Sequence, residues 1–259
     1  IYYAQVKPLY AYLDEVARMS NIYTRSNGRN LSSAKCALTW LNDWGQKEAF
    51  LSDPSSYGKF VRAWSLAAVS SSYIQIALDG RLDSAQKVAV KKWLSQLNKA
   101  VMRDYSSRYS DKSIPKNNNL YWAAWAVGIT STVLQNPENF RWAIEKAKTG
   151  LIQIEDDGTM PLEVRRASRA QLYHLFAAVP LVMLAELGAN NGVNLYAYNN
   201  GALHRLVKLN VTQFENPEYL THRSGARQSL DRKLIPAFVC WLEPYMTRFG
   251  FSDPKTARI

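Results

Sequence analysis

The sequence predicts an all-α fold of about eight to ten helices joined by short connections. Apolar residues recur at spacings of three and four along most of the chain, and no run shows the alternation that is typical of a strand. Turn and cap residues fall between the periodic segments. Antiparallel helices with wide apolar faces form a bundle, a solenoid or a toroid of helical hairpins, and the periodicity alone does not choose among these.

Local signals support several of the predicted helices. Asp83 is an N-cap candidate, and Asn136-Pro137 gives a cap followed by proline at the first helical position. Residues 155–158 read Glu-Asp-Asp-Gly, which predicts a turn. Pro180 lies inside a helical pattern and should kink it or break it locally. In chain order, the predicted helices cover about residues 33–50, 57–78, 84–105, 119–135, 137–152, 162–187, 199–214 and 226–248.

Composition and charge limit the classes of protein to which this chain can belong. The 259 residues are 47% hydrophobic, so we expect one domain, residues 1–259, with a substantial core and not a disordered chain. No uncharged apolar run is long enough to predict a membrane-spanning helix, and no signal-peptide pattern follows Ile1. The net charge of +11 favours polyanions such as nucleic acid, anionic lipid or acidic polysaccharide, although a merely basic protein has the same charge.

The two cysteines, Cys36 and Cys240, lie far apart in the sequence. They could form one disulfide or remain two buried thiols, and their spacing does not decide. Two cysteines are too few for a cysteine-rich zinc site.

The segment NNNLYWAAW, residues 117–125, places asparagines at the start of an aromatic helix. Such asparagines can simply cap the helix. Alternatively, neutral amides and free N–H groups at a helix N-terminus suit a carboxylate ligand, because the helix dipole favours negative charge there.

Arg166, Arg169 and Tyr173 follow at the spacing i, i+3 and i+7, which places them on one face of the predicted helix 162–187. A solvated basic face is the simplest interpretation. However, an arginine can bind a uronic-acid carboxylate, and a tyrosine beside it can move a proton.

These segments carry a resemblance to a known family. The NNNLYWAAW segment and MPLEVRRASRAQLYHLFAAVPLVMLAE, residues 160–186, resemble the alginate lyases of polysaccharide lyase family five. The similarity extends over most of the chain and includes CALTWL (36–41) and RAWSLA (62–67). It implies an incomplete (α/α) toroid with a deep cleft, and eliminative cleavage of a polyuronate without a metal or organic cofactor.

The resemblance also implies the catalytic residues. The family asparagine falls on Asn118, its arginine on Arg166 and its tyrosine on Tyr173, while Glu163 matches a glutamate that holds the arginine or the tyrosine in place. The family motif NNH-x-YW has a histidine where this chain has Asn119. His174 matches a histidine that lies beside the family tyrosine, so we expect it to be structural.

Elimination in a uronate needs a neutralised carboxylate, a base for the C5 proton and an acid for O4. Asn118, Arg166 and Asn119 can serve the carboxylate. In β-D-mannuronate the C5 proton and O4 lie on one side of the ring, so Tyr173 can act as base and then as acid. We therefore expect a lyase that prefers poly-β-D-mannuronate. The alternatives are a relative that acts on another polyuronate such as polyglucuronate, and a weakened or silent polyuronate-binding protein.

Further substrate contacts are expected around this centre. Tyr121, Trp122 and Trp125 could stack on sugar rings, although we expect two of the three to be core residues. The polar loop 23–30 reads as a lid or as an ordinary surface loop. Basic side chains that could extend the substrate site are Lys116, Arg25, Arg29, Arg169, Arg223 and Arg227.

Two other classes fit less well. A nucleic-acid binder should show a known module or a basic stripe, whereas these charges are spread over all helices. A glycoside hydrolase needs two carboxylates facing a cleft, and the acidic group Asp156, Asp157 and Glu163 falls partly in a turn. We expect a monomer without nucleic-acid or membrane partners, and the family implies a periplasmic or secreted location.

Overall fold

The computed structural model describes residues 2–108, 116–231, 233 and 235–250, and every regular element in them is a helix. The chain divides into two compact units, residues 1–110 with 126–141 and residues 111–125 with 142–259. We call these unit 1 and unit 2 and describe each by itself. The single domain predicted for residues 1–259 stays a prediction.

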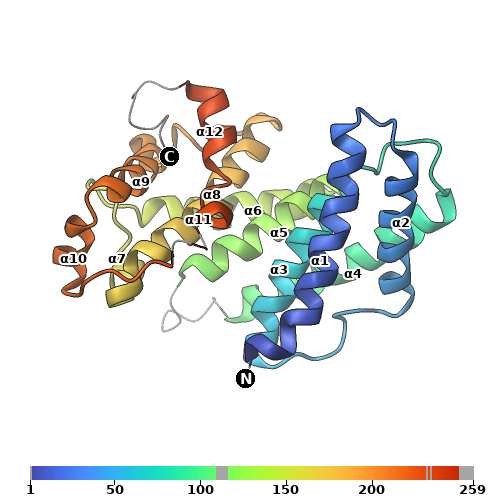
Figure 1. The fold of residues 1–259 in the computed structure, drawn as a ribbon, viewed down its shortest axis with the longest axis horizontal. Coiled ribbons are helices and arrows are strands. Elements are labelled where there is room, and N and C mark those ends of the chain that lie inside the picture. The colour runs from blue at the N-terminus through green and yellow to red at the C-terminus, as the bar shows by residue number, and fades with distance from the viewer. Residues whose placement is uncertain (1, 109–115, 232, 234, 251–259) are drawn as a thin grey trace. The chain divides into compact units, whose positions relative to one another are not determined.

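Unit 1 is built on four long helices, with the second half of α5 and the start of α6 added to it (Figure 1). Helix α1 packs on α2 and α3, and α4 also packs on α2 and α3. Side chains from these helices form the interior, among them Leu38, Leu66 and Trp93. The bounds are α1 Tyr2–Arg25, α2 Leu31–Gln46, α3 Ser56–Ile74, α4 Ser84–Arg108, α5 Asn118–Leu134 and α6 Pro137–Ile152.

Helix α1 was not assigned from the sequence, and it takes up the first part of the predicted loop 23–30. The remainder of that loop is a well-bonded turn and not an open lid. The Tyr23 hydroxyl donates to Asp79 at 2.7 Å, and the Arg81 guanidinium pairs with Asp79 and donates to the Gly28 carbonyl at 2.8 Å. Asn30 caps α2 by accepting from the Ser33 N–H.

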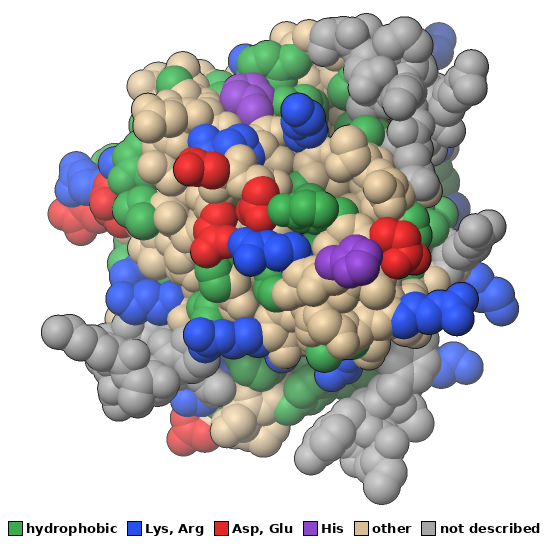
Figure 2. Space-filling model, turned by 90° about the vertical axis from the view of Figure 1, so that its left-hand side faces the viewer, with side chains coloured by type: hydrophobic (Ala, Val, Ile, Leu, Met, Phe, Trp, Pro, Cys, Tyr) green, Lys and Arg blue, Asp and Glu red, His purple; other side chains and the backbone are tan. Residues whose placement is uncertain are grey.

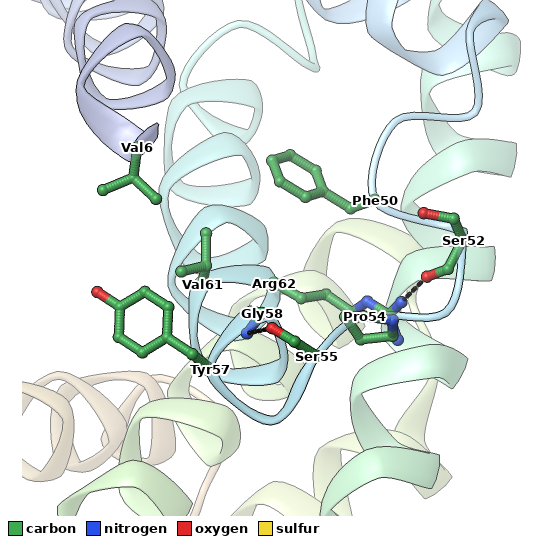
Figure 3. Close-up of a pocket in the computed structure, with 9 residues that line it drawn as sticks. All are labelled: Val6, Phe50, Ser52, Pro54, Ser55, Tyr57, Gly58, Val61 and Arg62. Atoms are coloured by element: carbon green, nitrogen blue, oxygen red, sulfur yellow. Dashed lines mark hydrogen bonds between the residues drawn. The ribbon is translucent and has the colours of Figure 1, made fainter. Parts of the chain in front are cut away.

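The side chain of Arg62 lines a cavity of about 250 Å³ in unit 1 (Figure 3). Arg62 donates to Asp104 at 2.9 Å and to the Ser52 carbonyl, and its side chain is almost completely buried. These bonds tie the loop before α3 to α4, so the RAWSLA segment has a structural role in this unit.

Unit 2 contains the first turns of α5, most of α6 and the remaining helices (Figure 1). Its core helix is α8, which packs on α9 and continues through the buried Pro180, so the predicted local break is absent. The bounds are α7 Pro161–Val164, a short 3₁₀ helix η1 Ala167–Arg169, α8 Ala170–Ala189, α9 Tyr198–Glu215, α10 Glu218–Ser224, α11 Ile235–Phe238 and α12 Leu242–Phe249.

Two of the helices predicted in unit 2 are divided in the structure. The helix predicted over 162–187 is three elements, because Ala167 has a left-handed backbone with φ of 53° that interrupts the helical path. The helix predicted over 226–248 is replaced by the short α11 and α12, with α10 ending earlier at Gly225 in the left-handed conformation.

By length and composition only, the stretch Ala167–Ala189 is long and apolar enough to cross a membrane. Of its most apolar window, 61% is buried inside the protein, as in a core helix. The turn predicted at 155–158 is confirmed. At Gly158 φ is 83°, and a Cβ there would overlap the Arg205 carbonyl oxygen, so the turn requires glycine at this position.

Candidate active site

The N-terminus of α5 holds a carboxylate that the protein itself supplies. Asn118 opens this helix, and its backbone N–H donates to Glu163 Oε1 at 3.0 Å. Its amide Nδ2 also donates to Glu163, at 2.9 Å to Oε1 and 3.0 Å to Oε2. Both residues are 0% exposed. Of the two interpretations of the asparagines, capping and binding of a carboxylate ligand, the structure shows Asn118 bound to a carboxylate of its own chain, Glu163 of α7.

Glu163 connects this helix end to the arginine of the predicted site. Arg166 Nε lies 3.6 Å from Glu163 Oε2. Burial raises the pKa of the Glu163 carboxyl, while the Asn118 hydrogen bonds and the Arg166 charge oppose that rise. Glu163 therefore fixes two predicted catalytic residues at once. Of the two roles that the family resemblance allowed, it is the arginine and not the tyrosine that this carboxylate contacts.

Arg166 and Arg169 both lie over the ring of Tyr173, although they are not on its helix. The guanidinium carbons are 4.4 Å and 5.7 Å from the ring centroid. Helix α8 begins at Ala170, and the turn at Ala167 folds the two arginines back over it. The predicted cluster of Arg166, Arg169 and Tyr173 is therefore present, but it results from a break in the helix and not from helical spacing.

Tyr173 is half-buried, and its ring edge contacts Phe176 at 6.3 Å between centroids. Among the described residues no hydrogen bond reaches its hydroxyl. The phenol therefore combines a fixed ring, two nearby cations and an unengaged O–H group, which suits proton transfer to a ligand.

His174 has the opposite surroundings. It is 0% exposed, its Nε2 accepts from the Met160 N–H at 2.9 Å, and its Nδ1 lies 2.7 Å from the Ala170 carbonyl oxygen. Burial lowers the pKa of the imidazole to about 4. With both ring nitrogens engaged, this histidine is neutral and structural, as the sequence analysis expected.

The other residues predicted on α5 divide between surface and core. Asn119 is half-buried and no hydrogen bond of its side chain is found in the described part of the chain. Tyr121 is buried and donates to the Lys116 carbonyl at 3.0 Å, so its predicted stacking on a sugar is not available here. Trp125 is buried as well, while half-buried Trp122 contacts Phe176 and donates to its carbonyl at 3.1 Å.

The basic residues predicted as further subsites have different surroundings. Lys116, Arg169 and Arg227 are exposed in unit 2. Arg223 does not fit the prediction, because it pairs with Glu155 at 2.6 Å and Asp157 at 3.1 Å and so clamps the turn at 155–158. Figure 2, on the side where α7, α9 and α10 lie, shows acidic and basic side chains next to one another. Arg25 and Arg29 are exposed in unit 1.

The cysteines and acidic residues show no metal site in the part of the chain that is described. No group of three or more histidine, cysteine, aspartate or glutamate side chains gathers there. Cys36 and Cys240 are free and exposed, so neither predicted state, a disulfide or two buried thiols, is found.

The sequence did not predict the hydrogen bonds that support the backbone at Lys116 and around Arg169. Gln153 Nε2 donates to the Lys116 carbonyl at 2.9 Å, and Gln228 bonds the backbone on both sides of Arg169. A single glutamine has no motif around it, and these partners are 37 to 61 residues away, so no local signal could have identified them.

Comparison with known proteins gives one consistent result. Alginate lyases of Pseudomonas putida strain W619 and of Cobetia marina are 34% and 33% identical over 235 and 220 residues, which is 89% and 83% of this chain. The chain spans only 63% and 58% of their lengths.

Solved structures of alginate lyase A1-III superpose closely. The crystal structure of the Sphingomonas species A1 enzyme matches at a TM-score of 0.85 with 26% identity, covering 98% of this chain and 72% of that chain. A histidine-to-alanine variant complexed with a tetrasaccharide matches at 0.85 over 96% of this chain and 70% of that one. The predicted fold class, an all-α (α/α) toroid, is confirmed. The alginate lyase family model matches residues 2–220, and the chain therefore belongs to the alginate lyase family.

Proposed function

We propose that this protein is a polysaccharide lyase of family five that cleaves an acidic polyuronate by β-elimination, with Tyr173 as the group that moves the proton. The observation that carries the proposal is the Tyr173 hydroxyl, which no hydrogen bond reaches from the described residues, on a ring that lies 4.4 Å from the Arg166 guanidinium. The relatives named alginate lyase support alginate as the substrate class.

The reaction follows from these groups. Arg166, assisted by Arg169, binds the uronate carboxylate and neutralises it, which makes the C5 proton acidic. The Tyr173 oxygen takes that proton as the base of the reaction. The C5 electron pair forms the C4–C5 double bond, the C4–O4 bond breaks, and Tyr173 returns its proton to O4. No other acid or base is required when the proton and O4 lie on the same side of the ring.

This route favours poly-β-D-mannuronate. In that ring the C5 proton and O4 are on one face, so a single tyrosine reaches both. A substrate with the two groups on opposite faces needs a second catalytic group, and we propose that Asn119 occupies the position of the family histidine that could serve. We therefore propose a mannuronate preference, with another same-face polyuronate such as polyglucuronate as the alternative.

The two asparagines have different proposed roles. The Asn118 donors are directed at Glu163, so Asn118 acts with Glu163 to hold the start of α5 and Arg166. The Asn119 side chain has no competing partner in the described chain and donates a hydrogen bond to the substrate carboxylate. It cannot supply a proton or a positive charge.

Solved relatives support a substrate longer than one sugar. Histidine-to-alanine and tyrosine-to-phenylalanine variants of alginate lyase A1-III are both complexed with a tetrasaccharide. For this chain we propose that Lys116 and Arg169 contact further carboxylates, with Trp122 beside the reacting sugar. We also propose that it acts as a monomer in the periplasm or outside the cell.

The test is direct. The protein is incubated separately with polymannuronate, polyguluronate and polyglucuronate, and the ultraviolet absorbance of the unsaturated product is followed. Faster product formation from polymannuronate than from the other two polymers supports the proposal. Product from polyglucuronate alone supports the alternative substrate, and binding without product on all three supports a silent relative.

A further inference from the structure

The turn between α7 and α8 has an unfavourable backbone that other groups must hold. Ala167 has a φ of 53°, a conformation that a residue with a Cβ rarely adopts. Arg166 and Arg169 flank it closely. In an unbroken helix Arg166 and Tyr173 would be two turns, about 10.5 Å, apart along the axis. The turn therefore brings the Arg166 guanidinium to the phenol ring.

Gln228 is bonded to both ends of this turn. Its Oε1 accepts from the Gln171 N–H at 2.9 Å, which is an N–H of the first turn of α8. Its Nε2 donates to the Ala167 carbonyl at 3.1 Å and to the Ala226 carbonyl at 2.7 Å. One amide thus joins the carbonyl of the strained residue to the start of the tyrosine helix.

The chain next to Gln228 adds a second bond. The Ser229 N–H donates to the Ser168 carbonyl at 2.7 Å. Gln228 is itself fixed by the Ser224 hydroxyl, 2.8 Å from Nε2, at the end of α10. The segment 226–229 is therefore a fixed support behind the turn, and it lies beyond the 2–220 match to the family model.

We propose that Gln228 is a positioning residue of the lyase: through the Ala167 carbonyl and the Gln171 N–H it sets the turn that places Arg166 and Arg169 over Tyr173. The proposal rests on the function proposed above. Gln228 acts only through the two arginines and does not touch the reacting atoms.

Two variants test the donor and the acceptor of the Gln228 side-chain amide separately. Gln228→Met has similar length but neither donates to Ala167 nor offers an oxygen to Gln171. Gln228→Glu keeps an acceptor for Gln171 and loses the donor. Gln96→Met is the matched control, because Gln96 is an exposed glutamine on α4 of unit 1.

Steady-state kinetics on polymannuronate give the first readout. We expect kcat of Gln228→Met to fall about ten-fold with KM changed less than about three-fold, because misplaced charge affects the transition state more than binding. Gln228→Glu should recover part of that loss, and Gln96→Met should match the wild type. Unchanged kcat in Gln228→Met, in an active wild-type background, overturns the proposal.

A double-mutant cycle separates positioning from general support. In an Arg166→Ala, Arg169→Ala background, Gln228→Met should cause no further loss of kcat, since the groups it positions are gone. A further loss of about ten-fold there would mean that Gln228 acts in another way, and the proposal would be wrong.

Hydrogen exchange gives a readout that does not need activity. Peptides covering 165–172 should exchange faster in Gln228→Met than in the wild type, with peptides of α4 unchanged, whether or not the protein is a lyase. An inactive wild type with this exchange difference overturns the proposed function alone. Unchanged exchange overturns the support role of Gln228.

Discussion

Tyr173 and His174 are neighbours on α8, and their surroundings differ in every respect that matters for chemistry. The imidazole is completely buried, and both its nitrogens are engaged by backbone groups. The phenol is half-buried, lies beneath two guanidinium groups, and has a hydroxyl without a bonded partner in the described chain.

The difference shows that the side chain best suited to proton transfer near neutral pH is not the one that the fold makes available. Successive residues of a helix are about 100° apart, so one can face the core while the next faces a ligand. His174 is used to tie Met160 and the turn before α7 to α8. Its place in the sequence beside Tyr173 therefore says nothing about catalysis.

The largest effect should come from removing the phenol oxygen. Tyr173→Phe keeps the ring under Arg166 but has no group to move a proton, so kcat on polymannuronate should fall by about 10²- to 10⁴-fold. The Kd for a mannuronate oligomer, measured by calorimetry, should change little. Substantial residual turnover would assign the proton transfer to another residue.

A smaller loss is expected when the cation over the ring changes shape. Arg166→Lys keeps the charge but loses the planar fork that binds a carboxylate with two bonds, so kcat/KM should fall about ten- to a hundred-fold. Arg165→Lys, at an exposed neighbour, is the matched control. An unchanged kcat/KM in Arg166→Lys would show that the charge alone suffices and that the planar fork is not needed.

At His174, the neighbour of Tyr173, His174→Gln should lower the free energy of unfolding more than it lowers kcat. The variant leaves the Met160 N–H or the Ala170 carbonyl poorly satisfied, and should lose about 1–3 kcal/mol in the free energy of unfolding, measured in urea near neutral pH. The kcat of the folded variant should stay within a few-fold of the wild type.

The same histidine predicts a pH dependence. Its pKa is about 4 in the folded protein against an ordinary value of 6.5. The unfolded chain therefore binds a proton first as the pH falls, and the histidine's contribution to stability, complete above pH 6.5, is lost as the pH falls from there toward 4. Urea midpoints across this range should decline more for the wild type than for His174→Gln. Parallel declines would mean that His174 is not buried as a neutral ring.

The smallest effect is expected at Asn119. Replacing it with histidine restores an ionisable group beside the proposed carboxylate site, so we expect a few-fold rise in rate or activity on polyguluronate. Turnover of both polymers by Asn119→His and the wild type gives the comparison. Identical profiles would show that Asn119 is not at the position of the family histidine.

The sequence predicts the elements of this molecule better than its contacts. Apolar spacing and caps identified α2 to α6 and α9, because those signals are local. The same spacing joined α7, η1 and α8 into one helix, since a positive φ at an alanine leaves no mark in a hydrophobic pattern.

The candidate site shows the same limit. Asn118, Arg166 and Tyr173 were found by motif, and Arg166 does meet Tyr173. The partner of Asn118 is Glu163, 45 residues away, and a pattern of residue types cannot tell whether a helix end holds a substrate carboxylate or one from its own chain. Arg223 was misread for the same reason, because Glu155 and Asp157 already pair with it.

One side-by-side assay tests the central claim. Wild type, Tyr173→Phe and His174→Gln, each shown to be folded by circular dichroism, are given polymannuronate while the unsaturated product is followed by ultraviolet absorbance. Product from the wild type and His174→Gln, with none above background from Tyr173→Phe, is the predicted result. Turnover by folded Tyr173→Phe together with a silent but folded His174→Gln would contradict it.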